Sequence, residues 1–331
     1  MQGVVATRYG GLDALAIVDR PEPVVGPRDV GIAVRAASLN PIDYKIREGK
    51  LKLVLDVAPP IALGCDVAGV VDAVGAEVTG FRAGDEVYAR LEKNRMGGLA
   101  ERAVADERVV ARKPARASFE EAAAVPLAGL TALQALREVA GVTAGQRVLI
   151  HAGAGGVGSL AIQIAKALGL HVATTTSTKN VELVRSLGAD EVIDYTKERA
   201  SDKLHELDAV FDSLGGASEL DSLAMVKRGG VVVGIGGLPD AAFARERLPW
   251  FARPAIWLAT GRRRRAAARA GARFVYLFMR PDGAQLAELA RWIDDGKLRP
   301  LVHKSYPLAA VRDAFAELER GRARGKIVVT I

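Results

Sequence analysis

The chain has little of the material from which metal sites and disulfide frameworks are built. Its 331 residues include one cysteine, Cys65, and four histidines. A single cysteine excludes an intrachain disulfide, and scattered histidines do not supply the three or four clustered ligands that tetrahedral zinc needs. We therefore expect no bound metal, and we interpret Cys65 as a buried packing residue.

Long hydrophobic runs are also absent, and aromatic residues make up only 5% of the chain. No apolar run approaches the roughly 18 residues of a membrane span. The first residues lack a basic segment followed by an apolar one, which a secretory signal would show. We expect a cytoplasmic protein without a membrane partner.

The chain is instead rich in glycine, with 35 residues, and half of it is hydrophobic. This composition is typical of α/β proteins, and the length suits two domains. Short β signals punctuated by glycine and proline fill residues 1 to about 115, as in a small irregular barrel. They lie at 31–34, 67–71, 85–88 and 108–110.

The pattern changes at residues 118–121, a capping box that predicts a helix over 122–140. Strands then alternate with helices, which indicates a doubly wound parallel sheet. The expected strands are 148–150, 172–175, 191–194, 209–212, 231–234 and 274–278. A helix over 284–294 leads into short β runs over 298–331. We therefore predict domains at 1–120 and 121–280, with 281–331 returning to the first.

A glycine-rich turn between the first strand and its helix carries the strongest functional signal. Gly153, Gly155 and Gly158 match G-x-G-x-x-G in a strand–turn–helix–strand context. Such glycines allow a tight turn, a close approach to a pyrophosphate and tight helix packing. The alternative is that they serve only the turn. The predicted cofactor loop consists of Gly153, Ala154, Gly155, Gly156, Val157 and Gly158.

The end of the second strand indicates which dinucleotide binds. NAD-binding proteins place an acidic residue about 20 residues past the fingerprint, on the ribose 2′-hydroxyl. Residues 174–180 contain hydroxyls and a lysine but no carboxylate, which favours a 2′-phosphate and therefore NADP. A solvated polar loop is the alternative. The residues expected here are Thr176, Ser177, Lys179, Asn180 and Tyr195.

Two further loops end strands at the carboxyl edge, where open α/β sheets bind ligands. They contribute Leu214 in one loop and Gly234, Ile235 and Gly236 in the next. We expect them to contact the cofactor, although glycine turns are common without any ligand.

An arginine run over 262–265 raises the question of a nucleic-acid partner. Alanines surround the run and no aromatic residue interleaves it, which favours a solvated helix face instead. The surrounding insertion, 238–272, contains Trp250, Phe251 and Trp257. The sequence leaves open whether this insertion is a substrate lid or a subunit contact.

With these landmarks placed, the chain resembles the zinc-independent quinone oxidoreductase and enone (alkenal) reductase branch of the medium-chain dehydrogenase/reductase superfamily. The resemblance implies a GroES-like catalytic domain, a Rossmann domain, an active site in the cleft between them, and NADPH as hydride donor. Zinc-dependent relatives carry cysteine at the position of Asn40 and a His-Glu pair at Cys65-Asp66. The motifs that carry the resemblance are 36–49, 63–75, 84–89, 122–136, 151–158, 177–195, 210–216, 296–308 and 323–329.

By this resemblance, the segment 40–45 lines the nicotinamide and substrate. Asn40 and Tyr44 are candidate catalytic residues, and Lys45 is a candidate for both catalysis and cofactor binding. Thr131 matches a family threonine near the nicotinamide. The structural alternatives are a helix cap for Asn40 and Asp43, packing for Tyr44, and a backbone-bonded hydroxyl for Thr131.

The expected function is NADPH-dependent transfer of a hydride to the activated C=C bond of an α,β-unsaturated carbonyl compound. Reduction of a quinone on the same scaffold is one alternative, and a non-catalytic NADPH- and RNA-binding protein is another. The partner we expect is a small-molecule enone or quinone, and a second copy of the chain is a further candidate because dimers are common on this scaffold.

Overall fold

The computed structural model describes residues 1–93 and 95–331, which fall into two compact units. One unit comprises residues 1–130 and 280–331, and the other comprises residues 131–279. The first border lies inside a helix, later in the chain than the sequence-based border at 120. No described helix is long and apolar enough to cross a bilayer.

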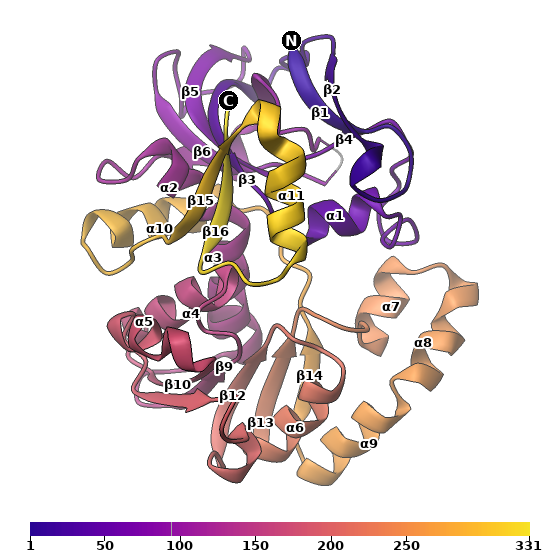
Figure 1. Cartoon of the computed structure of the whole chain (residues 1–331), viewed down its shortest axis with the longest axis vertical. Coiled ribbons are helices and arrows are strands. Elements are labelled where there is room, and N and C mark those ends of the chain that lie inside the picture. The colour runs from indigo at the N-terminus through magenta and orange to yellow at the C-terminus, as the bar shows by residue number, and fades with distance from the viewer. Residues whose placement is uncertain (94) are drawn as a thin grey trace. The chain divides into compact units, whose positions relative to one another are not determined.

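The 131–279 unit is built on a six-stranded parallel sheet in the order β11-β10-β9-β12-β13-β14 (Figure 1). Counted from β9, this order is 3-2-1-4-5-6, the dinucleotide-binding arrangement of doubly wound sheets. The α/β prediction is confirmed, and the strand order reverses between β9 and β12. The strands are β9 (Arg147–Ile150), β10 (His171–Thr176), β11 (Glu191–Asp194), β12 (Leu207–Asp212), β13 (Val226–Gly234) and β14 (Arg273–Tyr276).

Helices cover this sheet because its strands are apolar on both faces, as parallel strands usually are. Leu149, Val210 and Val232 are fully buried in one cluster with Leu223 of α6. The connecting elements are α4 (Gly156–Ala167), η4 (Thr178–Asn180), α5 (Val181–Ser186), η5 (Ala200–Asp202) and α6 (Ala217–Met225).

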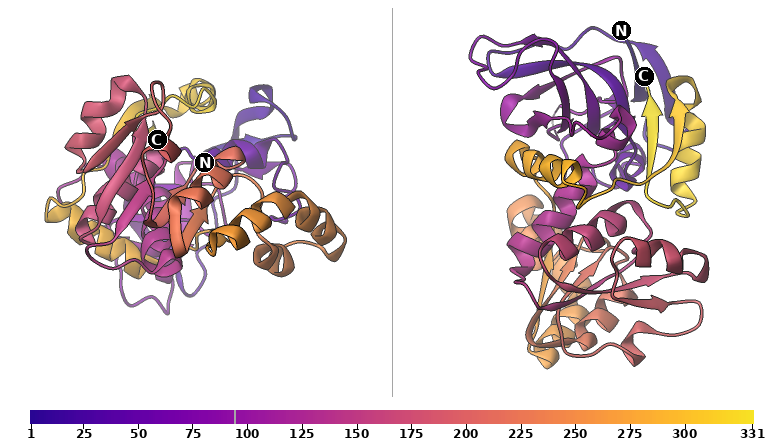
Figure 2. Two further views of the ribbon diagram at one scale, coloured as in Figure 1. Left: turned by 90° about the horizontal axis from the view of Figure 1, so that it is seen from below. Right: turned by 90° about the vertical axis from the view of Figure 1, so that its left-hand side faces the viewer.

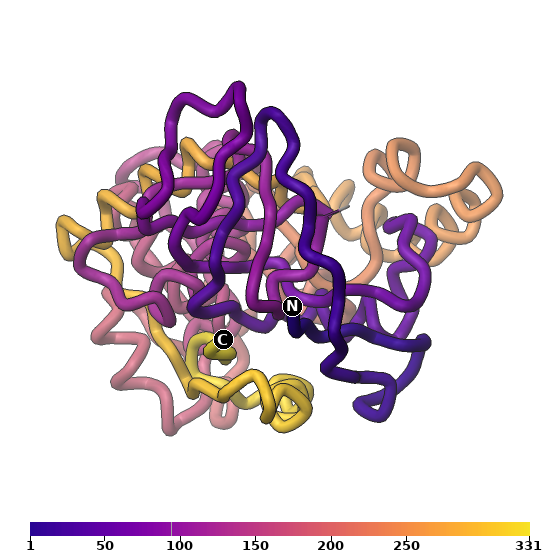
Figure 3. The backbone as a smooth tube through the Cα atoms, turned by 90° about the horizontal axis from the view of Figure 1, so that it is seen from above, coloured from indigo at the N-terminus to yellow at the C-terminus, as the bar shows by residue number. Residues whose placement is uncertain are grey.

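Between β13 and β14 the chain forms a run of helices, residues 241–270, which we call the helical arm. It consists of α7 (Ala241–Arg247), η6 (Trp250–Ala252), α8 (Arg253–Ala259) and α9 (Gly261–Ala270). α9 packs against α6 and β14, whereas α8 packs mainly against its neighbours in the arm. α8 therefore stands away from the parallel sheet (Figure 2, left, and Figure 3).

The other unit contains a three-stranded sheet, β2-β1-β4, and a seven-stranded sheet. The larger sheet runs β15-β16-β3-β5-β6-β8, with β7 also paired to β3. Figure 2 (right) shows β15 and β16, from the C-terminal end of the chain, side by side in parallel. The strands are β1 (Gln2–Ala6), β2 (Leu15–Asp19), β3 (Asp29–Ser38), β4 (Ile61–Ala62), β5 (Asp66–Val74), β6 (Glu86–Arg90), β7 (Arg102–Asp106), β8 (Val110–Arg112), β15 (Val302–Pro307) and β16 (Lys326–Thr330).

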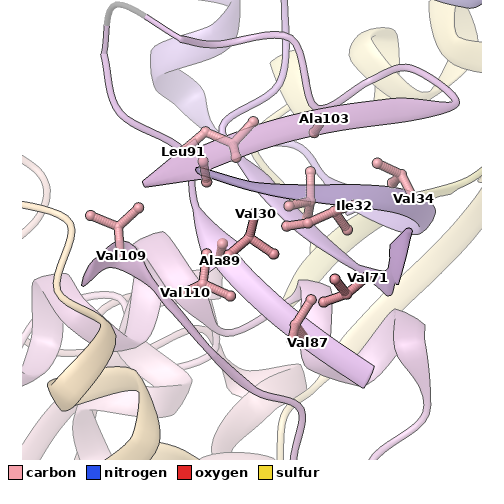
Figure 4. Packing of buried hydrophobic residues seen from close by; sticks show 12 residues of the cluster. Val30, Ile32, Val34, Val71, Val87, Ala89, Leu91, Ala103, Val109 and Val110 are labelled. Carbon is pink, nitrogen blue, oxygen red and sulfur yellow. The ribbon is translucent and has the colours of Figure 1, made fainter. Parts of the chain in front are cut away.

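Apolar side chains from the strands of the larger sheet pack together in one buried cluster (Figure 4). Val30 and Ile32 of β3 are fully buried and meet Val87 of β6 and Val71 of β5 in one cluster. Their alternation along each strand is the period of two that one buried face requires. The end of β3, from which the next helix begins, is held by its pairing with β5 and β16.

The helices of this unit depart from the sequence-based expectations in two places. The helix expected over 122–140 is divided, because Pro126 lacks an N–H and begins a new helix. Residues 298–331 contain the expected short β runs, as β15 and β16, and also a helix, α11, that the sequence analysis did not predict. The elements are η1 (Leu12–Ala14), α1 (Pro41–Arg47), η2 (Glu107–Val109), α2 (Phe119–Ala123), α3 (Pro126–Leu133), α10 (Gly283–Asp294), η7 (Leu308–Ala310) and α11 (Val311–Glu319), while η3 (Gln134–Ala140), a π-helix, follows α3 in the other unit.

One expected strand also begins later than predicted. Residues 108–110 were expected to be extended, but η2 occupies 107–109 and β8 starts at Val110. The cause is Asp106, whose carboxylate accepts a hydrogen bond from the backbone N–H of Arg108 and caps the short helix.

Candidate functional site

The glycine loop after β9 leaves no room for side chains at two of its three fingerprint positions. A Cβ on Gly153 would lie 2.1 Å from Thr174 Oγ1, and one on Gly158 would lie 2.2 Å from the carbonyl oxygen of Ala152. α4 begins after Gly155, which makes no side-chain cap. The N–H groups of its first turn are therefore open to an anionic ligand.

A buried polar network, absent from the sequence-based candidates, lies behind this loop. His151 follows β9, and its Nδ1 lies 3.1 Å from Thr175 Oγ1. Its Nε2 lies 3.2 Å from Ser222 Oγ, which in turn donates to Asp212 Oδ2 at 2.9 Å. Burial lowers the pKa of His151. A neutral imidazole is thus held between the carboxyl ends of β9, β10 and β12.

A hollow of about 290 Å³ opens at this same edge. His151 and Thr175 line it together with Tyr195, Leu214 and Ser218. The structure thus brings Tyr195 and Leu214, two predicted cofactor residues, to one concave surface at the carboxyl edge of the sheet. Tyr195 follows β11 and Leu214 follows β12, so the two residues reach this surface from strands that are not adjacent in the sheet.

The loop after β10 presents hydroxyls and an amide. Thr176 is buried, Ser177 is half buried and Lys179 is exposed. Asn180 is 9% exposed, donates from Nδ2 to Ser177 Oγ at 3.3 Å, and has no partner for its Oδ1 atom. An unpaired buried acceptor is costly unless a ligand or water satisfies it. The predicted residues of this loop are therefore together, with one atom ready to accept a hydrogen bond.

The sequence analysis missed a carboxylate beside this loop. Asp194 ends β11 and pairs in register with Thr176. Its carboxylate accepts a hydrogen bond from Thr178 Oγ1 at 2.6 Å, which with the donors of Thr196 lowers its pKa to about 2. The register of β10 and β11 is the signal that could have revealed it. Nζ of the exposed Lys197 lies 3.4 Å from this carboxylate and forms an ion pair with it.

The loops that follow β12 and β13 lie in close contact with each other. Asp212 Oδ1 accepts hydrogen bonds from the N–H groups of Leu214 and Gly215, both at 2.9 Å. Gly215 has a φ of +75°, and a Cβ there would lie 2.5 Å from Gly237 N. A Cβ on Gly236 would lie 3.1 Å from the backbone of Leu214.

The position of Gly234 and Ile235 follows from this contact between loops. Ile235 donates its N–H to the carbonyl oxygen of Asp212 at 3.0 Å, and Gly234 leaves room for the ring of Phe274. Both predicted cofactor residues therefore lie at the carboxyl end of β13, beside Leu214.

In the other unit, α1 follows β3 and carries the segment 40–45. The backbone N–H of Asn40 donates to Asp43 Oδ2 at 2.7 Å, which completes a capping box. Burial raises the pKa of Asp43 to about 6, and the nearby charge of Asp66 adds to the increase. Cys65 Sγ lies 3.6 Å from the other Asp43 oxygen, and burial raises the pKa of that thiol.

The side chain of Asn40 is buried and hydrogen-bonded to other residues of the chain. It is 2% exposed, donates to Asp66 Oδ2 at 2.9 Å, and accepts from Lys326 Nζ. Lys326 also donates to the carbonyl oxygen of Leu39 at 2.7 Å. Burial lowers the pKa of Lys326 and raises that of Asp66. Sequence reasoning missed Lys326 because it lies 286 residues from Asn40.

Tyr44 and Lys45 lie on the other face of α1, away from the buried Asp43, Ile46 and Arg47. Both side chains are half buried, and neither makes a hydrogen bond or ion pair with another described residue. Burial lowers the pKa of Lys45, and the neighbouring Lys50 charge adds to the effect. These two groups are thus available to a ligand, whereas Asn40 is not.

Thr131 is 4% exposed within α3. Over residues 1–93 and 95–331, no group of three or more His, Cys, Asp or Glu side chains is placed to hold a metal ion.

Comparison with known proteins gives matches along most of the chain. The alcohol dehydrogenase GroES-like domain family matches residues 26–115, and the zinc-binding dehydrogenase family matches residues 187–329. A 2-methylene-furan-3-one reductase of Solanum lycopersicum is 39% identical over 98% of this chain and 77% of its own length. An NADPH-dependent alkenal/one oxidoreductase, chloroplastic, of Arabidopsis thaliana is 38% identical over 99% of this chain and 79% of its own length.

The fold is similar to that of solved oxidoreductases. The quinone oxidoreductase from Coxiella burnetii superposes with a TM-score of 0.85 at 34% identity, covering 100% of this chain and 99% of that one.

Proposed function

This chain belongs to the medium-chain dehydrogenase/reductase superfamily, on the branch of quinone oxidoreductases and alkenal/one oxidoreductases, and from that premise we propose that it is an NADPH-dependent reductase of α,β-unsaturated carbonyl compounds. The relatives named above include a reductase of a methylene-furanone and an alkenal/one oxidoreductase. The compounds in both names contain a C=C bond and a carbonyl group.

The observation that carries the proposal is the carboxyl edge of the parallel sheet. There an uncapped helix start follows a glycine loop that has no space for side chains at Gly153 or Gly158. Beside it, the polar loop after β10 ends in Asn180 with its unpaired Oδ1 atom. The first feature suits a pyrophosphate, and the second suits a substituted ribose. The residues present therefore fit NADP.

Within this proposal, Ser177, Lys179 and Tyr195 contact the 2′-phosphate and its ribose. Hydroxyl and ammonium donors bind a phosphate through charge-assisted hydrogen bonds. The Asp194 carboxylate lies beside this loop, and its oxygens already accept hydrogen bonds from Thr178 and Thr196 and pair with Lys197. In this proposal it therefore does not accept a hydrogen bond from a ribose hydroxyl.

The bound NADPH supplies the hydride, and the chain supplies binding and charge stabilisation. Reduction of the C=C bond builds negative charge on the carbonyl oxygen of the substrate, and donors aimed at that oxygen lower the barrier. We assign this role to the Tyr44 hydroxyl and assign cofactor positioning to Lys45, because both are half buried without partners. Asn40 acts as a positioning residue, because its amide holds the start of α1 through Asp66 and Lys326.

We further propose that the protein acts without zinc and in the cytoplasm. The relatives include chloroplastic and mitochondrial forms, so location is a property to be measured for this chain. Association into a homodimer also stays a prediction, which sedimentation equilibrium would test.

Isotope transfer tests the reaction directly. With NADPH that carries deuterium at its transferable position, an enone substrate should give a saturated ketone labelled at the β-carbon. Label on the carbonyl carbon, with an allylic alcohol as product, would instead indicate carbonyl reduction and would overturn the proposal. NADH supplied at the same concentration is the control for cofactor choice.

Quinone reduction is the second candidate, favoured by the similarity to the Coxiella burnetii quinone oxidoreductase. Matched assays with an enone and a quinone, each under saturating NADPH, separate the two functions. We expect the larger kcat/KM with the enone, and a larger kcat/KM with the quinone would reverse the assignment. Absence of NADPH oxidation with either would support a non-catalytic, cofactor-binding protein.

A further inference from the structure

The helical arm accounts for the entire net positive charge of the chain. Its 30 residues, 241–270, include eight arginines and one glutamate. The whole chain has 46 basic and 39 acidic residues, so the remaining 301 residues have 38 of each and are neutral. A segment charged this strongly creates a local positive field that attracts an anionic partner.

Part of this arginine set serves the fold. Arg263 is 6% exposed, and its guanidinium donates to Glu219 at 2.8 Å and stacks 3.8 Å over the ring of Phe274. These contacts anchor α9 to α6 and β14. By contrast, five exposed arginines have no ion pair with any described residue, namely Arg245, Arg253, Arg262, Arg265 and Arg269.

Large apolar side chains lie beside these free charges. Trp250 is 78% exposed, Phe251 61%, Trp257 58% and Leu258 75%. The rings of Trp250 and Phe251 meet edge to face at 6.1 Å. The other large exposed apolar residues of the described chain are scattered, whereas these four fall within nine consecutive positions, 250–258, on η6 and α8 of the helical arm. Such a concentration marks an interaction surface.

The structure also joins the aromatic and basic groups, which the sequence keeps apart. The guanidinium of Arg264 lies 4.1 Å over the Trp257 ring, and Arg264 donates to Thr260 Oγ1. An arginine stacked on a tryptophan presents charge and apolar area together. Exposed tryptophan, phenylalanine and leucine flanked by arginine are the composition of elements that lie in the interface of a lipid bilayer.

We propose that the helical arm binds the surface of an anionic lipid membrane, with Trp250, Phe251 and Leu258 in the headgroup layer and the exposed arginines on lipid phosphates. This is peripheral binding, which needs no spanning helix and so leaves no long apolar run in the sequence. The proposal goes beyond our sequence-based expectation of no membrane partner, which was based on the absence of membrane spans. The inference is independent of the proposed reaction.

Two other occupants fit the arm less well. A two-fold dimer through this surface would place the same positive segment on both sides of the interface, where like charges repel. A single-stranded nucleic acid would require free aromatic faces for base stacking. One face of Trp257 is already covered by Arg264, and the aliphatic Leu258 offers no stacking surface.

Vesicle flotation of the full chain tests the proposal. The probe is a vesicle of phosphatidylcholine with roughly one-third phosphatidylglycerol, compared with phosphatidylcholine alone. We expect binding to the anionic vesicle only, lost near 1 M salt, where the screening length is about 3 Å. The emission of Trp250 and Trp257 should shift to shorter wavelength on binding.

Two variants remove the charged and apolar contributions separately. R262Q/R265Q/R269Q should weaken binding by roughly a hundredfold, about fivefold for each arginine. W250S/L258S should abolish the binding that remains at moderate salt. The matched controls are R28Q/R82Q/R322Q, three exposed arginines elsewhere, and V24S, at an 87% exposed valine. Both controls should bind like the wild type, and circular dichroism should show every variant folded.

Several results would overturn the proposal. Wild-type protein that fails to float with anionic vesicles would refute it, as would arm variants that bind like the controls. A dimer in solution that W250S/L258S converts to monomer would assign the surface to a second copy. Binding of single-stranded nucleic acid lost in the same variants, without vesicle binding, would assign it to nucleic acid.

Discussion

Lys45 has a half-buried ammonium without a partner among the described residues, and burial lowers its pKa. If it positions the cofactor, Lys45→Ala should raise the KM for NADPH while the fold stays intact, and kcat can fall with it. Lys50→Ala is the matched control, since that exposed lysine pairs with Glu48. Steady-state kinetics beside melting curves measure both. A lower melting temperature with normal kinetics in Lys45→Ala would mean that the residue only packs.

Tyr44 allows a complementary test on the same helix. If its hydroxyl donates only in the transition state, Tyr44→Phe should lower kcat and kcat/KM together, by roughly tenfold to a thousandfold. Tyr9→Phe is the control, because that hydroxyl bonds the Val57 carbonyl oxygen at 2.7 Å. A change in KM alone would assign Tyr44 to substrate binding rather than to charge stabilisation.

Asp43 should make stability depend on pH in an unusual direction. Its pKa rises from 3.8 to about 6 in the folded protein, mainly because of burial. Between pH 4 and 6 the folded state therefore binds more protons than the unfolded state, and the free energy of unfolding falls as pH rises. The decrease amounts to at most about 3 kcal/mol, and it levels off above pH 6.

Denaturant unfolding of the wild type, Asp43→Asn and Asp106→Asn from pH 2 to pH 7 isolates this effect. As pH rises from 4 to 6, the free energy of unfolding of the wild type should fall relative to that of Asp43→Asn. Asp106→Asn is the control of opposite sign, because Arg108 lowers the pKa of Asp106 to about 2. Its stabilising effect is present above pH 4 and is lost as pH falls from about 4 to about 2. A pH-independent difference for Asp43→Asn would contradict a carboxyl with a raised pKa.

At the scale of elements, the loop after β10 should decide the choice of cofactor. Ser177→Asp places a carboxylate where a 2′-phosphate is expected, so NADPH use should weaken far more than NADH use. Ser186→Asp adds the same charge at an exposed position on α5 and should leave the preference unchanged. The measurement is kcat/KM for both cofactors. Equal loss for both, or a wild-type preference for NADH, would remove the NADP assignment.

Elements with a strong local pattern could be predicted from the sequence. The parallel strands are short apolar runs bounded by glycine, and Ser118 and Glu121 form the capping box that their spacing indicates. α11 was missed although Val311, Ala314 and Phe315 follow helical spacing, because the region was interpreted from its flanking β signals. Pro126 likewise signalled a new helix start inside the segment expected to be continuous.

At the scale of the whole molecule, the contacts that set the site could not be predicted. The Asn40 amide meets Lys326 across 286 residues, and Arg47 meets Glu319 across 272. No local pattern encodes such pairs, since they depend on β16 pairing with β3 and on α11 packing near α1. A single sequence therefore indicated Asn40 as a catalytic candidate, whereas the folded chain uses its amide internally.

The same long-range arrangement underlies the prediction of metal independence. One matching family is described as zinc-binding dehydrogenase, and zinc-dependent members carry a cysteine where this chain has Asn40. Here the Asn40 amide donates to Asp66 and accepts a hydrogen bond from Lys326. Cys65 is buried, and burial raises the pKa of its thiol. A thiol must lose its proton to bind zinc, so a raised pKa opposes coordination.

We therefore expect purified protein to contain well under one zinc per chain by elemental analysis. Its NADPH oxidation should persist after dialysis against a strong chelator, with a zinc-dependent alcohol dehydrogenase treated in parallel as the positive control. Adding zinc afterwards should not raise the rate, because among the described residues no three His, Cys, Asp or Glu side chains are grouped to hold a metal ion. One tightly bound zinc per chain, with activity lost on chelation and restored by the metal, would contradict the prediction and would make Cys65 and Asp66 the first ligands to test by substitution.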